Sequence, residues 1–526
     1  MPRTPSSRFF DALLAGLFVA ALWVPLLGLR QTPPVALSEK RLPAARPALP
    51  RTWAQVRTFP QAFEAWFNDH FGLRDALIRT HARMLVFGLH TSPSPKAILG
   101  RDGFIFLRGR PEDDGNPIAD YRGTRPLSRY ELERWRWQLE DEAEWLNRHG
   151  VSFLFAVAPG KERMAADCLP PGFGNIGRPG ALDQFTAHLA PRVTFRFLDL
   201  TPAVRTAREA GYGFRRTDTH WNDDGAWAAI RAMTDALRPE FPSLPAPESL
   251  DLVRTRAWYA EGDMGNVLGL PGEIGEWLDW VRPRAPRAQA TLLRPHHLAD
   301  LVTSTGDDAL PDAILFHDSF GHYLKPFFGE HFRTLRYCWS NAGLDPRVVA
   351  EHAPRLVIHL MGERRIRMGQ RYPVSLQQFG NQARFERAET VLGLWTAGEG
   401  PLPLVPAPGV LAMAQPEGLA LTPETPKPLA WSWPAIPDTA KWLPILKLSL
   451  HSRHPNELAM AWQTASAEYA PDFVPLLIKA PVPAGDSDVY LPLLDPDAVG
   501  PLAFRLSRQT GSLTLRRVEI RGVPRN

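Results

Sequence analysis

An aspartate and a histidine stand two residues apart in the stretch Asp218-Thr219-His220, shortly before a predicted helix. Asn222 is a suitable N-cap for that helix, and apolar residues recur at helical spacing over residues 226–237. A neutral imidazole on such a loop can accept a proton near pH 7, and a neighbouring carboxylate can fix its tautomer. The spacing therefore predicts acid–base chemistry, with His220 as the base and Asp218 as the residue that orients it.

A serine that could complete this pair follows a predicted strand. Residues 313–316 form a short apolar run, and Ser319 stands where that run gives way to a predicted helix. Parallel sheets place their sites at the carboxyl edge, and backbone amides at a helix start can stabilise an oxyanion. Ser319, His220 and Asp218 are therefore predicted to form a catalytic triad, with Ser319 as the nucleophile.

A metal site is the competing hypothesis, because the same stretches are rich in carboxylates and imidazoles. No His-x-x-x-His pattern or cysteine pair accompanies them, so the triad is favoured and no metal is expected. Neither a glycine-rich dinucleotide loop nor a phosphate loop is present, and no cofactor is expected. The possible metal ligands are Asp218, His220, Asp223, His317, Asp318 and His322.

Alternating helices and strands are predicted to position these residues. Ser128 and Glu131 form a capping box before an apolar stripe, and Gly150 can end that helix. Residues 151–158 are apolar almost throughout, as in a strand buried on both faces of a sheet. The pattern predicts an α/β fold with helices on both faces of a parallel sheet. Further strand-like runs lie at residues 193–200, 335–339 and 356–360.

The composition divides the 526-residue chain into regions. Residues 61–395 form the predicted α/β domain. After it, prolines are frequent and short strand-like runs replace helices, so residues 396–526 are predicted to form a separate β-sandwich. The formal net charge is only +4, which argues against a nucleic-acid binder.

The N-terminus carries a run, residues 12–29, that contains no charged residue and follows Arg3 and Arg8. This run is short for a membrane span and long for the core of a signal peptide. We predict an uncleaved signal anchor within residues 1–32, with a cleaved signal peptide as the alternative, and a proline-rich tether over residues 33–60. Either prediction exports the rest of the chain. Cys168 and Cys338 could then pair, although two cysteines make no disulfide framework.

Short segments spread over residues 50–370 match the motifs of a known family. Asp318-Ser319-Phe320 resembles the Gly-Asp-Ser block of SGNH hydrolases, and residues 218–222 resemble an acid–base block. The Asp-x-His precedes the serine, as in a circularly permuted arrangement. In these respects the chain is similar to the AlgJ/AlgX-like family of alginate O-acetyltransferases. Further matching segments are residues 67–74, 100–106, 159–161 and 262–264.

The resemblance implies a periplasmic O-acetyltransferase that acts on an exported polysaccharide through an acetylated Ser319. It also implies a membrane protein of the MBOAT type as acetyl donor and a C-terminal domain that holds the polymer. Lys161 and Arg364 lie in family-like segments and are candidate substrate contacts.

Aromatic residues of the C-terminal domain are candidates for stacking on sugar rings, although most are expected to pack in the core. The basic cluster of Arg364, Arg365, Arg367 and Arg371 favours an acidic polymer, and a neutral polymer such as cellulose stays open. Two other functions also stay open: a carbohydrate acetyl-esterase with the same triad, and an anchored glycan-binding protein without activity. The stacking candidates are Trp431, Trp433, Trp442, Trp462 and Tyr469.

Overall fold

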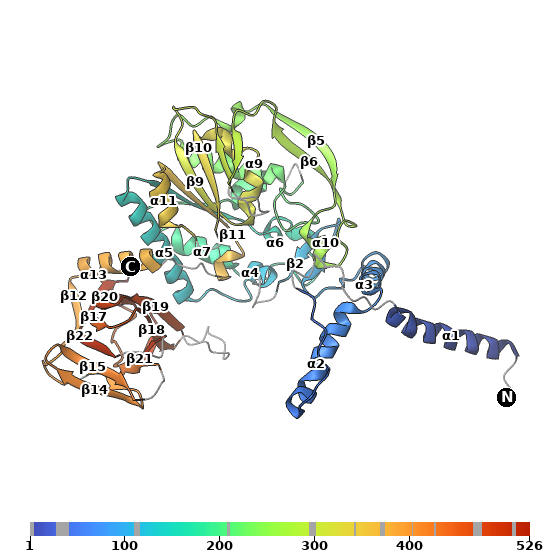
Figure 1. The fold of residues 1–526 in the computed structure, drawn as a ribbon. Helices are drawn as coiled ribbons and strands as arrows, with labels where there is room; N and C mark the ends of the chain where they lie inside the picture. Colours follow the sequence, from blue (N-terminus) through green and yellow to red (C-terminus); the bar gives the residue numbers. More distant parts are fainter. Residues whose placement is uncertain are drawn as a thin grey trace.

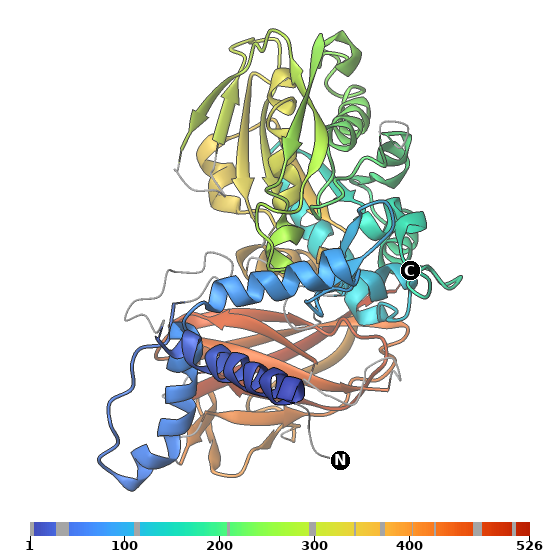
Figure 2. The same ribbon diagram turned by 90° about the vertical axis from the view of Figure 1, so that its right-hand side faces the viewer.

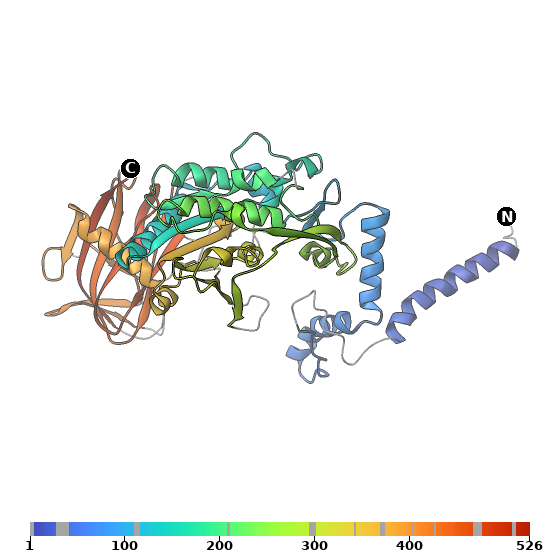
Figure 3. The same ribbon diagram turned by 90° about the horizontal axis from the view of Figure 1, so that it is seen from above.

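An α/β domain and a β-rich domain make up most of the molecule, and helices α1 and α2 project away from both (Figures 1 and 3). The β-rich domain lies beneath the α/β domain in two perpendicular views (Figures 1 and 2). The computed structural model describes residues 5–27, 42–109, 116–207, 211–293, 301–340, 343–368, 374–401, 403–424, 428–465, 476–507 and 512–525.

The α/β domain is built on a central sheet whose described strands follow the order β4-β3-β11-β9-β10-β8-β7. The first five are parallel, which confirms the predicted parallel sheet. At one edge β8 pairs antiparallel with β10, and β7 pairs antiparallel with β8, which the sequence analysis did not predict. The bounds are β3 (Ser152–Ala158), β4 (Arg196–Asp199), β7 (Gln289–Leu292), β8 (Leu301–Ser304), β9 (Asp312–His317), β10 (Thr334–Trp339) and β11 (Leu356–Gly362).

Helices cover both faces of this sheet, as the sequence predicts (Figure 1). Successive side chains of β3 alternate between two cores, because strand residues point to opposite faces in turn. Leu154 packs with α9, whereas Phe155 packs with α5 and α7. On the α9 face lie α8 (Thr201–Thr206), α9 (Asp223–Leu237), η5 (Ser319–Leu324) and η6 (Phe328–His331). On the opposite face lie α5 (Arg129–Arg148), α7 (Ala181–Leu189), α11 (Pro346–His352) and α12 (Arg365–Met368).

Two hairpins and several short helices surround the sheet. The turn of the first hairpin has positive φ angles at Asp102 and Gly103, which is typical of a tight turn. The strands of the second hairpin are separated by α10. These elements are β1 (Ala97–Leu99), β2 (Ile105–Leu107), β5 (Leu252–Tyr259), β6 (Glu276–Pro283), α4 (Pro117–Arg122), α6 (Lys161–Met164), η2 (Ala166–Cys168), η4 (Pro247–Ser249) and α10 (Asp263–Val267).

The N-terminal part is more helical than the sequence analysis predicts. Residues 53–60 belong to α2 (Trp53–His70), and not to a tether, because Thr52 and Gln55 form a capping box that starts a helix there. Helix α3 (Arg74–Arg83) follows and continues into the π-helical turn η1 (Met84–Gly88).

Helix α1 (Pro5–Leu27) contains most of the run that we predict to be a signal anchor. Among the described residues, no helix has the length and apolar character needed to cross a membrane. Arg8 and Asp11 fall inside α1, so its uncharged part begins only at Ala12 and is shorter than the ~20 residues of a typical span. The predicted membrane anchor is thus not supported.

The C-terminal domain consists of two described sheets that enclose one apolar core, which confirms the predicted β-sandwich. It begins before residue 396, because β12 (Thr390–Thr396) pairs with β22. One sheet holds β12, β14 (Val410–Gln415), β15 (Gly418–Pro423), β17 (Trp442–Ser452), β20 (Gly485–Pro492) and β22 (Leu513–Pro524). The other holds β13 (Val405–Pro406), β16 (Ala430–Trp433), β18 (Asn456–Thr464), β19 (Leu476–Val482) and β21 (Ala498–Leu506).

The two domains share core residues instead of being joined by a free linker. Tyr130 and Trp137 of α5 belong to the core of the sandwich, and so does Phe385 of α13 (Val374–Arg387). The Gln378 side chain accepts a hydrogen bond from the amide of Tyr490 and donates one to its carbonyl, and each of these bonds is 3.0 Å long.

Both cysteines are buried in the α/β domain, and neither is in a disulfide. Cys168 ends η2 and packs with residues of the first hairpin, whereas Cys338 lies on β10. The disulfide that the sequence analysis left open does not form, since each thiol packs in a different core cluster.

Candidate active site

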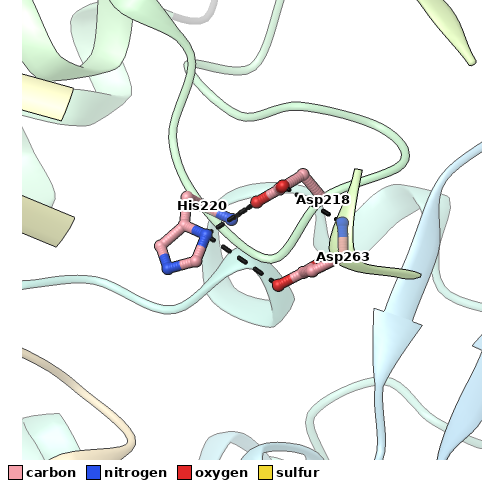
Figure 4. Close-up of side chains that lie close together, drawn as sticks. All are labelled: Asp218, His220 and Asp263. Atoms are coloured by element: carbon pink, nitrogen blue, oxygen red, sulfur yellow. Dashed lines mark hydrogen bonds and ion pairs between the residues drawn. The ribbon is translucent and has the colours of Figure 1, made fainter. Parts of the chain in front are cut away.

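Asp218 and His220 form a hydrogen-bonded pair on the loop that precedes α9. Asp218 Oδ1 lies 2.6 Å from His220 Nδ1 and also accepts from the His220 amide over 3.0 Å. The loop ends at Asn222, whose side chain caps α9 through the amide of Gly225 as predicted. His220 Nε2 points away from the carboxylate (Figure 4), is buried, and has no hydrogen-bond partner in the described part of the chain. The imidazole therefore presents a free acceptor nitrogen opposite its carboxylate.

A second carboxylate, Asp263 at the start of α10, supports this loop (Figure 4). It accepts from the Thr219 amide over 2.9 Å and from the Thr219 hydroxyl, and it lies 3.9 Å from His220 Nδ1. The Asp263 amide in turn donates to Asp218 Oδ2 over 3.2 Å. Gly262 makes this approach possible, because a Cβ there would lie 2.3 Å from the carbonyl oxygen of Thr217.

A buried arginine faces the Asp218 carboxylate. The Arg215 guanidinium lies over the rings of Tyr323, Tyr259 and Trp280, at 4.3, 4.8 and 5.2 Å from their centroids. Burial by itself raises the pKa of Asp218, but the hydrogen bonds from His220 and the charge of Arg215 lower that pKa well below its usual range. Asp218 is thus an anion at neutral pH, as a tautomer-fixing partner must be.

Lys161 holds the loop that carries Asp218 and His220 in place. Its ammonium donates to the carbonyl oxygens of Ile105, Arg216 and Asp218, over 2.6, 2.7 and 3.0 Å. The side chain is only 2% exposed, and burial lowers its pKa to about 8. We predict Lys161 as a substrate contact from sequence, but its three N–H groups are already used, which indicates a structural role.

Ser319 is the first residue of the 3₁₀ helix η5, which follows β9 at the predicted strand-to-helix turn. Asp318 fixes the turn, because its carboxylate accepts from the amides of Phe320 and Gly362 over 3.0 and 2.8 Å. The serine hydroxyl accepts from Arg364 Nη2 over 3.3 Å. Arg364, which sequence predicts as a substrate contact, therefore reaches the predicted nucleophile.

The serine turn and the dyad come together through Phe320. The Phe320 ring lies 5.1 Å from the His220 ring, and its carbonyl accepts from Trp221 Nε1 over 3.2 Å. His220 Nε2 makes no hydrogen bond to Ser319 in the part of the chain that the structure describes. The serine turn thus packs against the dyad through Phe320, and the hydrogen bond between Ser319 and His220 that the predicted triad needs is not formed.

A small pocket opens beside this turn. Burial raises the pKa of Glu162 to about 7, and the charge of Glu363 acts in the same direction. A Cβ on Gly160 would lie 2.9 Å from Glu162 Oε2 and 3.2 Å from Glu363 Oε2, so the two carboxyl groups are neighbours. The pocket lining includes Lys161, Glu162, Thr219, Phe320, Glu363 and Arg364.

Asp218, His220 and Asp263 have ligand atoms within 4.8 Å of one another, as a metal site would require. Hydrogen bonds already use both oxygens of Asp218 and the Nδ1 atom of His220, which favours the dyad over a metal. Two of the other possible ligands are used elsewhere. Asp223 accepts from the Val281 amide over 2.9 Å, and Asp318 caps the serine turn.

The tryptophans that we predict to stack on sugars are mostly core residues. Trp431 is 2% exposed and stacks on Phe504 with a centroid distance of 5.3 Å, so that prediction is wrong. Trp462 is equally buried, and its indole N–H donates to Asp495. Trp442 is half-buried at the start of β17. Tyr469 and Arg371 lie outside the described residues.

A dyad and a serine turn at the carboxyl edge of a mostly parallel sheet define an SGNH hydrolase-like domain. Residues 99–321 match a family described as "SGNH hydrolase-like domain, acetyltransferase AlgX", and this match ends two residues after Ser319. Over these residues the chain is similar to the AlgJ/AlgX-like family.

Two curated relatives are named probable alginate O-acetylase AlgJ. The protein from Pseudomonas putida is 28% identical over 247 residues, which are 40% of this chain and 60% of the relative. The one from Pseudomonas aeruginosa is 26% identical over 262 residues, 48% of this chain and 60% of the relative. The chain thus spans about 60% of the length of these relatives.

Two solved structures are similar to parts of this chain. The O-acetyltransferase domain of Pseudomonas putida AlgJ has 19% identity and a TM-score of 0.39, over 55% of this chain and 99% of that domain. Pseudomonas aeruginosa AlgX has 14% identity and a TM-score of 0.36, over 81% of this chain and 94% of AlgX.

Proposed function

We propose that this protein transfers acetyl groups to hydroxyls of an exported polysaccharide through an acetyl ester on Ser319. His220 Nε2 takes the hydroxyl proton while Ser319 Oγ attacks the donor carbonyl, and the departing group then receives that proton. In the second half, a sugar hydroxyl gives its proton to His220 and attacks the acetyl ester, and Ser319 recovers its proton. Asp218 stabilises the imidazolium in both halves.

The free Nε2 of His220 is the observation that carries this proposal. Leaving a buried polar atom without a partner costs about 1–3 kcal/mol. Among the described residues, His317 and His331 also have a buried ring nitrogen without a partner, so the free nitrogen of His220 is informative because of the groups around it. Here the opposite nitrogen is held by an anionic carboxylate, and the serine turn packs on the imidazole. This arrangement supports His220 as the general base.

Ser319 must exchange its partner for the reaction to start. Its hydroxyl faces the guanidinium of Arg364 in this structure, and a change of side-chain rotamer would turn it toward His220. After this rotamer change, Arg364 stays near the reacting carbonyl, where its charge would stabilise the developing oxyanion. Arg364 thus acts in the proposal as an electrostatic partner of the acyl-enzyme.

The identities proposed for the acceptor and the donor are inferred from the relatives and from the sequence. The printed names of the curated relatives support a polysaccharide acceptor of the alginate class. The predicted export supports a periplasmic reaction. A membrane protein of the MBOAT type remains our proposed donor partner, and the β-sandwich our proposed carbohydrate-binding domain.

A Ser319→Ala variant tests the proposal directly. The protein is incubated with an activated acetyl ester and an alginate oligosaccharide, and mass spectrometry then locates the acetyl group on protein and sugar. We expect the variant to lose the acetylated peptide and to transfer acetyl at least about 10³-fold more slowly. Ser249→Ala, at an exposed serine of the same domain, is the control.

Two results would change the assignment. Undiminished transfer by Ser319→Ala would remove Ser319 as the nucleophile. Transfer of acetyl to water alone, even with saturating oligosaccharide, would make the protein an acetyl-esterase.

A further inference from the structure

The outer face of the β5–β6 hairpin carries two exposed tryptophans. Trp258 and Trp277 are paired directly across the strands, and their rings meet edge to face at 5.7 Å and 70°. They are 55% and 59% exposed. Neighbouring exposed indoles of this kind are typical of a binding surface, because they cost solubility without adding to the core.

The first of these rings is held in place by a glycine. A Cβ on Gly275 would lie 2.6 Å from Cζ2 of Trp258, so the ring packs against the bare backbone there. A ring that is fixed before binding loses little conformational entropy when a ligand stacks on it. The pair therefore forms a rigid aromatic platform.

An open groove of about 420 Å³ runs beside the platform. Both tryptophans line it, together with the exposed charged side chains of Arg216, Arg256 and Asp279. A pyranose ring has apolar C–H faces and a rim of hydroxyls, so it needs flat aromatic surfaces surrounded by hydrogen-bonding groups. The groove offers this combination, with charges of both signs.

The inner face of the same hairpin supports the dyad. Tyr259 OH donates to Asp218 Oδ2 over 3.4 Å. The Glu276 carboxylate accepts from the amides of Arg216 and Thr217, over 2.9 and 2.8 Å, and from the Thr217 hydroxyl. Arg216 and Thr217 also line the groove. The loop that carries the dyad therefore forms one wall of the groove.

We propose that the groove and the Trp258–Trp277 platform form a distal subsite for the polysaccharide acceptor, within the α/β domain. This inference rests on the polysaccharide acceptor proposed above. A chain of sugars that stacks on the platform passes over the loop of residues 216–220 and delivers a hydroxyl to the pocket beside Ser319. The hairpin then connects acceptor binding on one face to dyad geometry on the other.

Binding measurements on the full chain test this subsite without requiring turnover. Calorimetry is done with alginate oligosaccharides and, separately, with cello-oligosaccharides of increasing length. We expect the wild type to bind longer chains more tightly, and Trp258→Ala/Trp277→Ala to weaken that binding about tenfold or more. The two sugar series decide whether the subsite prefers acidic or neutral chains. Trp53→Ala, which removes an 83% exposed tryptophan of α2, is the control.

Kinetics and a vesicle assay separate the remaining outcomes. In acetyl transfer to the longer chains, we expect the double variant to raise KM by the same factor with a much smaller change in kcat. Unchanged sugar binding in the double variant would overturn the inference, as would no sugar binding by the wild type. Loss of binding only to phospholipid vesicles would overturn it in favour of a membrane surface. If Ser319→Ala still transfers acetyl while the double variant loses binding, the proposed chemistry fails and the subsite stands.

Discussion

Glu162 is a buried carboxyl group to which no arginine or lysine is bonded in the described residues, and it lines the same pocket as Arg364, the hydrogen-bond partner of Ser319. Its neighbour Glu363 is engaged by the Gly160 amide and by Arg163. Because burial raises the pKa of Glu162 from 4.5 to about 7, the folded protein keeps this proton to a higher pH than the unfolded chain does. Between those two values the folded state binds more protons, so raising the pH favours unfolding.

Glu162→Gln should remove this pH dependence. The amide keeps the shape of the neutral acid, so the variant should gain up to about 3 kcal/mol over the wild type at pH 8 and almost nothing near pH 4.5. Denaturant unfolding from pH 4.5 to 8 measures the difference, with Glu389→Gln at an exposed position as the control. A constant difference between variant and wild type across this range would contradict the assigned ionisation.

The dyad could be read from the sequence because its two members share one short loop. Asp218 and His220 are two positions apart, and a capped helix follows them directly. Their supporting residues, such as Tyr259 and Glu276, come from a hairpin about 40–60 residues further along the chain. No periodicity in the sequence shows which face of that hairpin meets the loop. Lys161 was found, but its role was not, because the carbonyls that it binds belong to two segments far from it in the sequence.

At the scale of elements, α10 is fastened to the dyad loop by contact between two backbones. Gly262 precedes α10 and lies so close to Thr217 that no side chain fits between them. This contact places the Asp263 amide on Asp218 and the Asp263 carboxylate on Thr219. The position of α10 therefore sets the orientation of the dyad.

Gly262→Ala should impair the reaction more than the fold. The added methyl group must push α10 away from Thr217, and a displacement of about 1 Å can cost about 100-fold in kcat. Hydrolysis of an activated acetyl ester measures kcat, and circular dichroism checks the fold. Gly174→Ala is the matched control, because a methyl group there meets nothing within 4 Å. Wild-type kcat in Gly262→Ala would exclude this role for α10.

The hydrophobic pattern predicted which segments form strands better than it predicted how the strands pair. The run over residues 151–158 is buried on both faces, and this made β3 recognisable. The antiparallel edge of β7 and β8 was missed, because both strands are short and half-exposed or exposed along most of their length. The start of the sandwich was placed too late, since the pairing of β12 with β22 joins residues more than 120 positions apart.

At the scale of the whole molecule, the two domains share one boundary core. The Tyr130 ring on α5 meets the Trp462 ring of the sandwich at 5.6 Å, and Asn381 of α13 donates to the Tyr490 carbonyl. Removing the sandwich would expose these apolar side chains. A deletion would therefore destabilise the α/β domain as well as remove any glycan site, and point variants are the better probe.

The two domains should unfold together. Tyr130→Ala removes a buried ring from the shared core and should lower the free energy of unfolding by about 3 kcal/mol. Hydrogen exchange followed by mass spectrometry should show equal loss of protection in β9 and β17. Val499→Ala, at a 43% exposed position of β21, should change neither. Loss of protection in β17 alone would mean that the domains unfold independently.

The enclosure of Lys161 has a consequence for the proposed acyl-enzyme. Free amines attack acyl esters more readily than sugar hydroxyls do, so a lysine beside the acyl-serine is a risk of self-modification. The three carbonyl oxygens around this ammonium accept all of its hydrogens, so the amine can react only if these hydrogen bonds break, although burial lowers its pKa to about 8. The fold thereby places a positive charge next to the dyad loop and keeps the Lys161 amine from competing with the sugar for the acetyl group.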